Sequence, residues 1–184
     1  MSSIVETAIE VLYAAKVPLA AGLSPWRIEK IEDRFSFEFS PDHAQFLSLA
    51  MPIGPEWVDW LGDASGIQKR LDWPRDGVLF DVRENAFWPE RWGERPPDVR
   101  EAVQTAREQL GAVATLIPIY SHRFMPAAPA PAGSPVFSVH QADVIYYGSD
   151  LAAYFQSEFF NIPDRKLPSH HVDFWSELAE GQWI

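Results

Sequence analysis

Residues 116–155, LIPIYSHRFMPAAPAPAGSPVFSVHQADVIYYGSDLAAYF, contain the pattern that decides the fold. Branched and aromatic side chains predict strands over Leu116–Phe124, Val136–Val139 and Val144–Tyr147. The intervening segment APAPAGS has neither a helical nor a strand period, so it predicts a proline-rich loop between neighbouring strands. Pro118 lacks a backbone donor, and we expect it at a sheet edge, at a bulge or where its donor would face outward.

A capped helix follows the last predicted strand. Residues 140–143 predict a tight return into that strand, and Ser149 or Asp150 then serves as the helix N-cap. The predicted apolar face of the helix consists of Leu151, Tyr154, Phe155 and Phe159.

Helix start signals organise the first third of the chain. Apolar residues at spacings of three and four predict an amphipathic helix over residues 4–15, ending before Pro18. Its apolar stripe should dock on the core or on another subunit. The serine–proline pairs at 24–25 and 40–41 are typical of an N-cap followed by a first-turn proline, and they predict two more helices.

The middle of the chain is less regular, because tryptophans alternate there with glycine, proline and acids. A short helix is predicted around Ile67–Leu71. The run GVLFDV at residues 77–82 is too short to assign by periodicity, since a buried strand and a buried helical turn read alike at that length. We prefer an extended conformation for it.

Two helices are predicted towards the C-terminal half. Pro96, Pro97 and Asp98 open the first, in which apolar residues from Val99 to Leu110 share a face and Gly111 supplies the stop. The segment FWSEL at residues 174–178 predicts a short closing helix.

Size and charge limit the class of protein. The chain has 184 residues, 47% of them hydrophobic, which suits a single domain over residues 1–184 with residues 1–22 as an N-terminal helical extension. Fifteen basic and twenty-six acidic residues give a formal net charge of -11. Such a surface repels nucleic acid and attracts cationic proteins, so we expect a protein partner and no nucleic acid. An acidic surface that only maintains solubility is the simpler alternative.

The sequence carries no cysteine, which excludes disulfides, thiol nucleophiles and thiolate metal ligands. Glu6 and Glu10 lie where a signal peptide would be basic. No apolar run approaches the roughly 20 residues that a membrane-spanning helix needs. We therefore expect a cytoplasmic protein without membrane contact.

Catalytic and metal-binding motifs are weak. The histidine pair at 170–171, with Asp173 nearby, lacks the usual ligand spacing, and adjacent residues of a strand point to opposite faces. The same geometry separates Ser121 from His122 on the predicted strand. We therefore predict neither a metal site nor a catalytic triad with Asp143, and no GxSxG turn is present.

Acids near tryptophans raise the alternative of a glycosidase with paired carboxylates. With twenty-six acids and eight tryptophans, such proximity is expected by chance. No GxxxxGK[ST] or GxGxxG loop occurs, so we expect no cofactor and no catalytic residue. The acids concerned are Asp81, Glu84, Glu90 and Glu94, around Trp88 and Trp92.

Several blocks in one order resemble the SUKH superfamily, which includes the fungal Smi and Knr cell-wall regulators and many bacterial immunity proteins. The resemblance covers about residues 23–160. It rests on FSFEFSPDHAQF (35–46), RLDWPRDGVLFDV (70–82), FWPERWGERP (87–96), LIPIYSHRFMP (116–126) and PVFSVHQADVIYYGSDLAAYF (135–155). It implies an α+β domain with a mostly antiparallel sheet packed by helices, and it implies no known catalytic residues.

The resemblance also implies work by protein binding. We expect a non-enzymatic immunity protein that blocks a cognate toxin, and a basic toxin domain would suit the charge of -11. Aromatic residues and arginines are enriched in interface hot spots, so the predicted partner surface is Trp88, Trp92, Arg95, His122 and Arg123.

Three alternatives stay open at this point. The first is a regulatory or scaffold protein of the Smi/Knr type, although the chain lacks the long disordered extensions of the fungal proteins. The second is an enzyme that acts on a small molecule or glycan in a tryptophan-lined acidic pocket. The third is a regulatory domain that forms a homodimer through its N-terminal helix.

Overall fold

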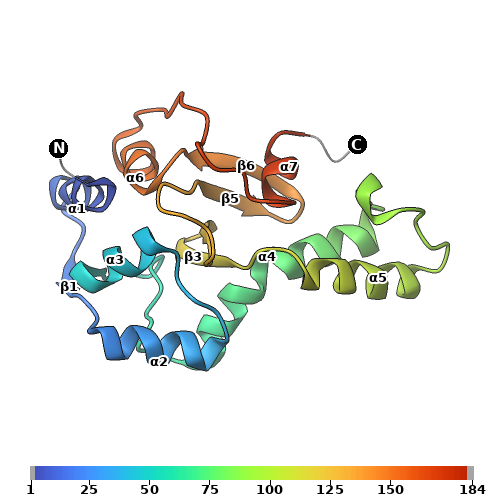
Figure 1. The fold of residues 1–184 in the computed structure, drawn as a ribbon, viewed down its shortest axis with the longest axis horizontal. Helices are drawn as coiled ribbons and strands as arrows, with labels where there is room; N and C mark the ends of the chain where they lie inside the picture. The colour runs from blue at the N-terminus through green and yellow to red at the C-terminus, as the bar shows by residue number, and fades with distance from the viewer. Residues whose placement is uncertain (1–2, 182–184) are drawn as a thin grey trace.

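The computed structural model describes residues 3–181, in which the chain forms seven α-helices and six β-strands (Figure 1). None of these helices is both long and apolar enough to cross a lipid bilayer. The helices are α1 (Ile4–Ala14), α2 (Pro25–Phe35), α3 (Pro41–Leu49), α4 (Ala64–Glu84), α5 (Val99–Gly111), α6 (Leu151–Phe160) and α7 (Trp175–Ala179). A short 3₁₀ helix, η1, spans Glu90–Trp92.

The strands form two antiparallel sheets. A two-stranded sheet pairs β1 (Leu19–Ala21) with β2 (Ala50–Pro52). The larger sheet has the order β3-β4-β5-β6, so each strand lies beside its neighbour in sequence. Its strands are β3 (Leu116–Tyr120), β4 (Arg123–Pro126), β5 (Val136–His140) and β6 (Asp143–Gly148). The predicted class, α+β with an antiparallel sheet packed by helices in one domain, is confirmed.

The larger sheet is buried on both faces. Because side chains alternate along a strand, Ile117 and Leu116 enter two different hydrophobic clusters. Helices α1, α2, α3 and α6 supply the cluster around Ile117, whereas α5, α7 and the C-terminal half of α4 supply the cluster around Leu116. The long helix α4 contributes to both, with Ile67 on one side and Val82 on the other. Figure 1 shows α4 running from the neighbourhood of α2 to the end where it packs with α5.

The predicted helix starts are confirmed. Both serine–proline pairs occupy the N-cap and first-turn positions, of α2 and α3 respectively. Asp98 caps α5 by accepting hydrogen bonds from two backbone N–H groups, and Asp150 caps α6 by accepting one from Ala153. Ser24 and the two aspartates accept hydrogen bonds from N–H groups that the helix itself leaves free, whereas Ser40 makes no side-chain cap hydrogen bond. These contacts fix where α2, α5 and α6 begin.

The extended conformation preferred for residues 77–82 is wrong, because these residues belong to α4. The helix starts at the N-cap Asp63 and continues through Pro74, which is buried and cannot donate a backbone hydrogen bond. Val78 and Val82 lie one helical turn apart, and neither side chain is exposed. Packing of this face against α5 therefore decides the conformation.

The single strand predicted over 116–124 is also wrong, since it is a hairpin. Ser121 and His122 form the turn between β3 and β4, and Ser121 has a left-handed φ of 47°. Pro118 lies on β3, at the edge of the sheet and next to a register shift, as predicted. Strands β4 and β5 are neighbours joined by the proline-rich segment, also as predicted.

The N-terminal segment packs into the core. Val5, Ala8 and Leu12 of α1 are at most 1% exposed, and α1 lies against α6 and α3. The apolar stripe of α1 is therefore covered within the same chain and is not available to a second copy. A homodimer stays a prediction, but it would have to form through a surface other than the apolar stripe of α1.

His43 on α3 is a buried base in an aromatic environment. It is 1% exposed, and its ring centroid lies 4.8 Å from that of Phe39 and 6.3 Å from that of Trp60. Burial removes the solvation of the imidazolium, so the pKa of His43 is lowered to about 3. Its Nδ1 atom has no hydrogen-bond partner among residues 3–181.

His43 should make the protein less stable in mild acid. An unfolded histidine binds a proton below pH 6.5, whereas folded His43 does so only below pH 3, so stability is lost as the pH falls between these values. This linkage lowers the free energy of unfolding by about 2 kcal/mol between pH 7 and pH 5. Urea unfolding at both pH values should show that loss in the wild type and a smaller one in His43→Phe.

The exposed His171 offers a matched control, since His171→Phe should keep the wild-type pH dependence. His122, whose pKa is also lowered, acts equally in all three proteins and cancels from the comparison. If His43→Phe kept the pH dependence of the wild type, the pKa of His43 would not be lowered in the folded protein.

Candidate functional site

A cavity of about 470 Å³ lies between α4, the β3–β4 turn and the end of β5. Helix α4 contributes Lys69, Arg70 and Trp73, which share one side of the helix because they are spaced by one, three and four residues. The hairpin and β5 supply the opposite wall, and Glu56 from the β2–α4 loop completes it. The residues of that wall are Ser121, His122, Phe124 and His140.

The backbone carbonyl of Glu56 holds the cavity walls together. It accepts hydrogen bonds from the backbone N–H of Ser121 at 2.8 Å and from Nη1 and Nη2 of Arg70, each at 3.1 Å. Charge-assisted bonds of this kind are stronger than neutral ones. On the far side, the indole Nε1 of Trp73 donates to the carbonyl of Val139 at 3.3 Å. These contacts fix helix, loop and hairpin relative to one another.

Ser121 and His122 are brought together, contrary to the prediction that they face opposite sides of a strand. The turn places Ser121 Oγ 3.1 Å from His122 Nδ1. The pKa of His122 is lowered, first by burial and then by the neighbouring Arg123. The imidazole is therefore held in its neutral form, in which one ring nitrogen accepts and the other donates.

This pair does not form a catalytic triad with Asp143. A triad requires a carboxylate that hydrogen-bonds the second nitrogen of the histidine. Asp143 lines a different hollow, and no carboxylate among residues 3–181 accepts a hydrogen bond from His122. The arrangement supplies a polar wall but no activated nucleophile.

A second feature is an open groove of about 800 Å³ beside α2. Its wall combines four carboxylates with an aromatic ring and a proline. Glu29 and Asp33 lie four residues apart on α2, so both face the groove from one side of the helix. The remaining lining residues of interest are Glu32, Phe37, Glu38 and Pro129.

A third hollow, of about 650 Å³, is the nearest counterpart of the tryptophan-lined acidic pocket considered above. It contains Trp88, Asp81, Glu90 and Asp143. Both carboxylate oxygens of Asp81 are already bonded, one to the Asn85 side chain and the other to the backbone N–H of Ala142. Asp81 therefore joins α4 to the β5–β6 turn and is not free for proton transfer.

The predicted partner residues fall into two separate groups. Trp88, Trp92 and Arg95 close the connection between α4 and α5. Trp92 is 7% exposed and stacks on Phe174 with ring centroids 5.7 Å apart. Arg95 donates to the carbonyl of Val82, and its guanidinium lies 6.0 Å from the ring of Trp88.

The other group, His122 and Arg123, lies at the β3–β4 hairpin. Arg123 is 8% exposed; its guanidinium lies 3.8 Å from the Tyr147 ring, and it bonds Glu158 at 3.1 Å and Ser138 at 2.9 Å. Trp92 and Arg123 are both buried, so little of either side chain is accessible in the free protein, and their partner role stays a prediction. For the half-buried Trp88, Arg95 and His122, a partner role stays a prediction.

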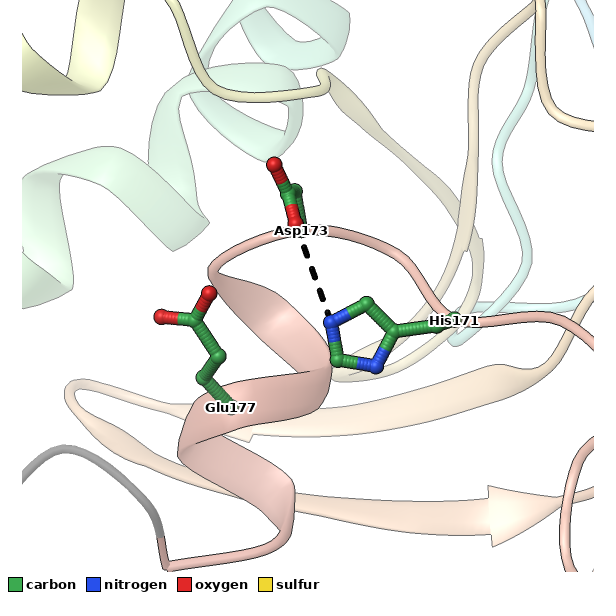
Figure 2. Close-up of side chains that lie close together, drawn as sticks. All are labelled: His171, Asp173 and Glu177. Carbon is green, nitrogen blue, oxygen red and sulfur yellow. Dashed lines mark ion pairs between the residues drawn. The ribbon is translucent and has the colours of Figure 1, made fainter.

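Figure 2 shows His171, Asp173 and Glu177 gathered around the start of α7. One ligand atom from each lies within 4.8 Å of the others. Glu177 is already paired with Arg91 at 2.6 Å, while the His171–Asp173 contact is long, at 3.7 Å. Glu177 is half-buried, whereas His171 and Asp173 are exposed, and the contacts among the three groups alone do not define a metal site.

Sequence reasoning did not identify the acids of the groove or the basic residues of the cavity. A signal existed for the groove, because Glu29 and Asp33 share a helix face that was correctly predicted. The sequence signal for the cavity was weaker. Lys69, Arg70 and Trp73 come together only when α4 is recognised as one long helix.

Compared with known proteins, the chain matches no protein family model, no curated protein and no solved structure. The resemblance to the SUKH superfamily therefore stays a prediction.

Arg123 should contribute to stability. Replacing it by alanine leaves the largely buried Glu158 carboxylate without its partner, which should lower the free energy of unfolding by about 3 kcal/mol. The Arg91–Glu177 pair offers a more exposed control, and Arg91→Ala should cost below about 1 kcal/mol. Urea unfolding measures both. Equal losses in the two variants would contradict a structural role for Arg123.

Zinc should not stabilise the protein through the His171 cluster. We expect the melting temperature of tag-free protein to be unchanged on adding Zn²⁺, because Glu177 is engaged by Arg91 and the other two groups are exposed. Saturable stabilisation that disappears in His171→Ala would contradict this expectation.

Proposed function

We propose that the chain is a non-enzymatic, SUKH-like protein-binding domain that acts as a bacterial immunity protein, blocking a cationic toxin by one-to-one binding. The observation that carries the proposal is the groove beside α2, which four acidic residues and Phe37 line together. Such a surface suits a partner rich in lysine and arginine, as many proteins that cleave nucleic acid are.

Charge supports this proposal at two levels. The whole chain carries a formal net charge of -11, which draws a cationic partner towards it over distances of about a Debye length. The four acidic residues of the groove then concentrate negative charge at one place on the surface. Attraction of this kind mainly raises the association rate, and it weakens as salt increases.

The groove is also held in shape by internal contacts. Glu32 accepts a hydrogen bond from the backbone N–H of Phe39 at 2.8 Å, and the carbonyl of Glu38 accepts one from Ala128 at 2.9 Å. Phe37 packs edge-on against Phe39, with ring centroids 4.8 Å apart. A surface fixed before binding loses less conformational entropy in the complex, which favours affinity.

The alternatives receive less support. An enzyme with a tryptophan-lined acidic pocket would use the hollow around Trp88, but the oxygens of Asp81 there are already bonded. A regulatory or scaffold protein of the Smi/Knr type would use the same acidic groove without inhibiting its partner. Inhibition is therefore the property that separates the immunity role from the regulatory one.

Reversing two charges in the groove should weaken partner binding. In Glu29→Lys/Asp33→Lys we expect at least about tenfold weaker binding, because two attractive contacts become repulsive. The partner is first captured from native cell extract with the wild type, identified by mass spectrometry and purified. Affinity and stoichiometry then follow from calorimetry, and inhibition from the partner's own activity.

Glu10→Lys/Glu108→Lys is the matched control, since it changes the net charge equally at exposed positions of α1 and α5. It should bind nearly as tightly as the wild type. Equal weakening in both double variants would mean that only total charge matters and that the groove is not the interface. A complex without loss of the partner's activity would favour the regulatory role.

A further inference from the structure

The cavity between α4 and the β3–β4 turn is lined mainly by basic side chains, although the protein as a whole is acidic. Lys69, Arg70, His122 and His140 line it, and Glu56 is the one carboxylate among its lining residues. The chain as a whole has nearly twice as many acidic as basic residues. A cavity lined by basic side chains favours an anionic ligand, whereas the acidic groove favours a cationic one.

We propose that this cavity binds a small aromatic phosphate monoester of nucleotide size. The cationic side chains and the hydroxyl of Ser121 would hold the phosphate, while Trp73 would pack against the flat ring. The volume of about 470 Å³ lies within the range of about 300–1,000 Å³ that is usual for small-molecule sites.

Donors from three elements favour a phosphate over a carboxylate. Lys69 and Arg70 approach from α4, Ser121 from the turn and His140 from β5. A phosphate offers three terminal oxygens to such a set, whereas a carboxylate offers two. Arg70 already shares its Nη atoms with the carbonyl of Glu56, which holds its guanidinium at the cavity wall.

The aromatic wall is held in place. Trp73 is 50% exposed, yet its indole N–H is bonded to the carbonyl of Val139, so the ring is fixed with an open surface. Phe124, 1% exposed, also lines the cavity beneath the surface. A half-exposed indole fixed in this way can pack against a flat ring in the ligand.

Histidine protonation should couple binding to pH. His122 is neutral in the free protein because burial, Arg123 and His140 lower its pKa, while Glu158 and Glu56 act in the opposite direction. A bound phosphate adds negative charge that favours the imidazolium, so binding should tighten as the pH falls from about 8 to about 7, above the range near pH 6 in which the phosphate itself takes up a proton. The site uses side chains instead of a glycine-rich loop, so it has no motif in the sequence.

Calorimetric titrations with AMP, inorganic phosphate and adenosine test the two halves of the site. AMP should bind more tightly than either of the others, because only AMP offers both a phosphate and a ring. Lys69→Ala and His140→Ala, both at exposed positions, should each weaken AMP binding roughly tenfold. Lys30→Ala and His171→Ala are the matched controls and should leave the affinity for AMP unchanged.

Each contrary result overturns the proposal. Adenosine binding as tightly as AMP would exclude the phosphate contact, and phosphate binding as tightly as AMP would exclude the ring contact. Failure of all three probes to bind saturably in the millimolar range would exclude the site. Folding of each variant is checked by its melting temperature. Of these substitutions, only the control Lys30→Ala touches the acidic groove, through its ion pair with Asp33.

Discussion

The hydrogen bonds to the carbonyl of Glu56 are the contacts on which the arrangement of the elements depends. Through them the β2–α4 loop, helix α4 and the β3–β4 turn meet at one oxygen atom. The adjacent Trp57 reinforces the junction, since it bridges to Tyr120 and stacks on Phe159 of α6. Because α4 reaches both hydrophobic clusters, holding its first half against the hairpin also sets where its second half meets α5. The basic cavity lies between the segments that meet at this junction.

Local signals predicted much of the fold. Ser24 and the aspartate caps mark helix starts because they satisfy backbone donors within a few residues, and the proline after Ser40 suits a first helical turn, so no distant contact is needed. The two errors have non-local causes. Residues 77–82 are helical because α5 covers one face of them. The turn at 121–122 lacks glycine, asparagine or aspartate, and its left-handed Ser121 is held by a hydrogen bond to the distant residue Glu56.

The candidate sites were harder to predict than the fold. Composition suggested tryptophan and arginine as partner contacts, but both residue types also stabilise interiors. Trp92 stacks on Phe174, and Arg123 lies between a ring and a carboxylate, so each is used inside the protein. The acidic groove could have been found from helix spacing alone. The basic cavity could not, because its lining residues come from four separate segments between Glu56 and His140.

The edges of the larger sheet limit how the protein can recognise a partner. At one edge, Pro118 has no N–H to offer, β3 is bulged, and Trp57 already bridges to its end. At the other edge, β6 packs with α6 and α7. Strand β3 therefore presents only an interrupted ladder of donors and acceptors to an incoming chain. A partner that meets the β3 edge must therefore be recognised through side chains and surface shape, because strand addition, with the sequence tolerance that main-chain pairing brings, is not open there.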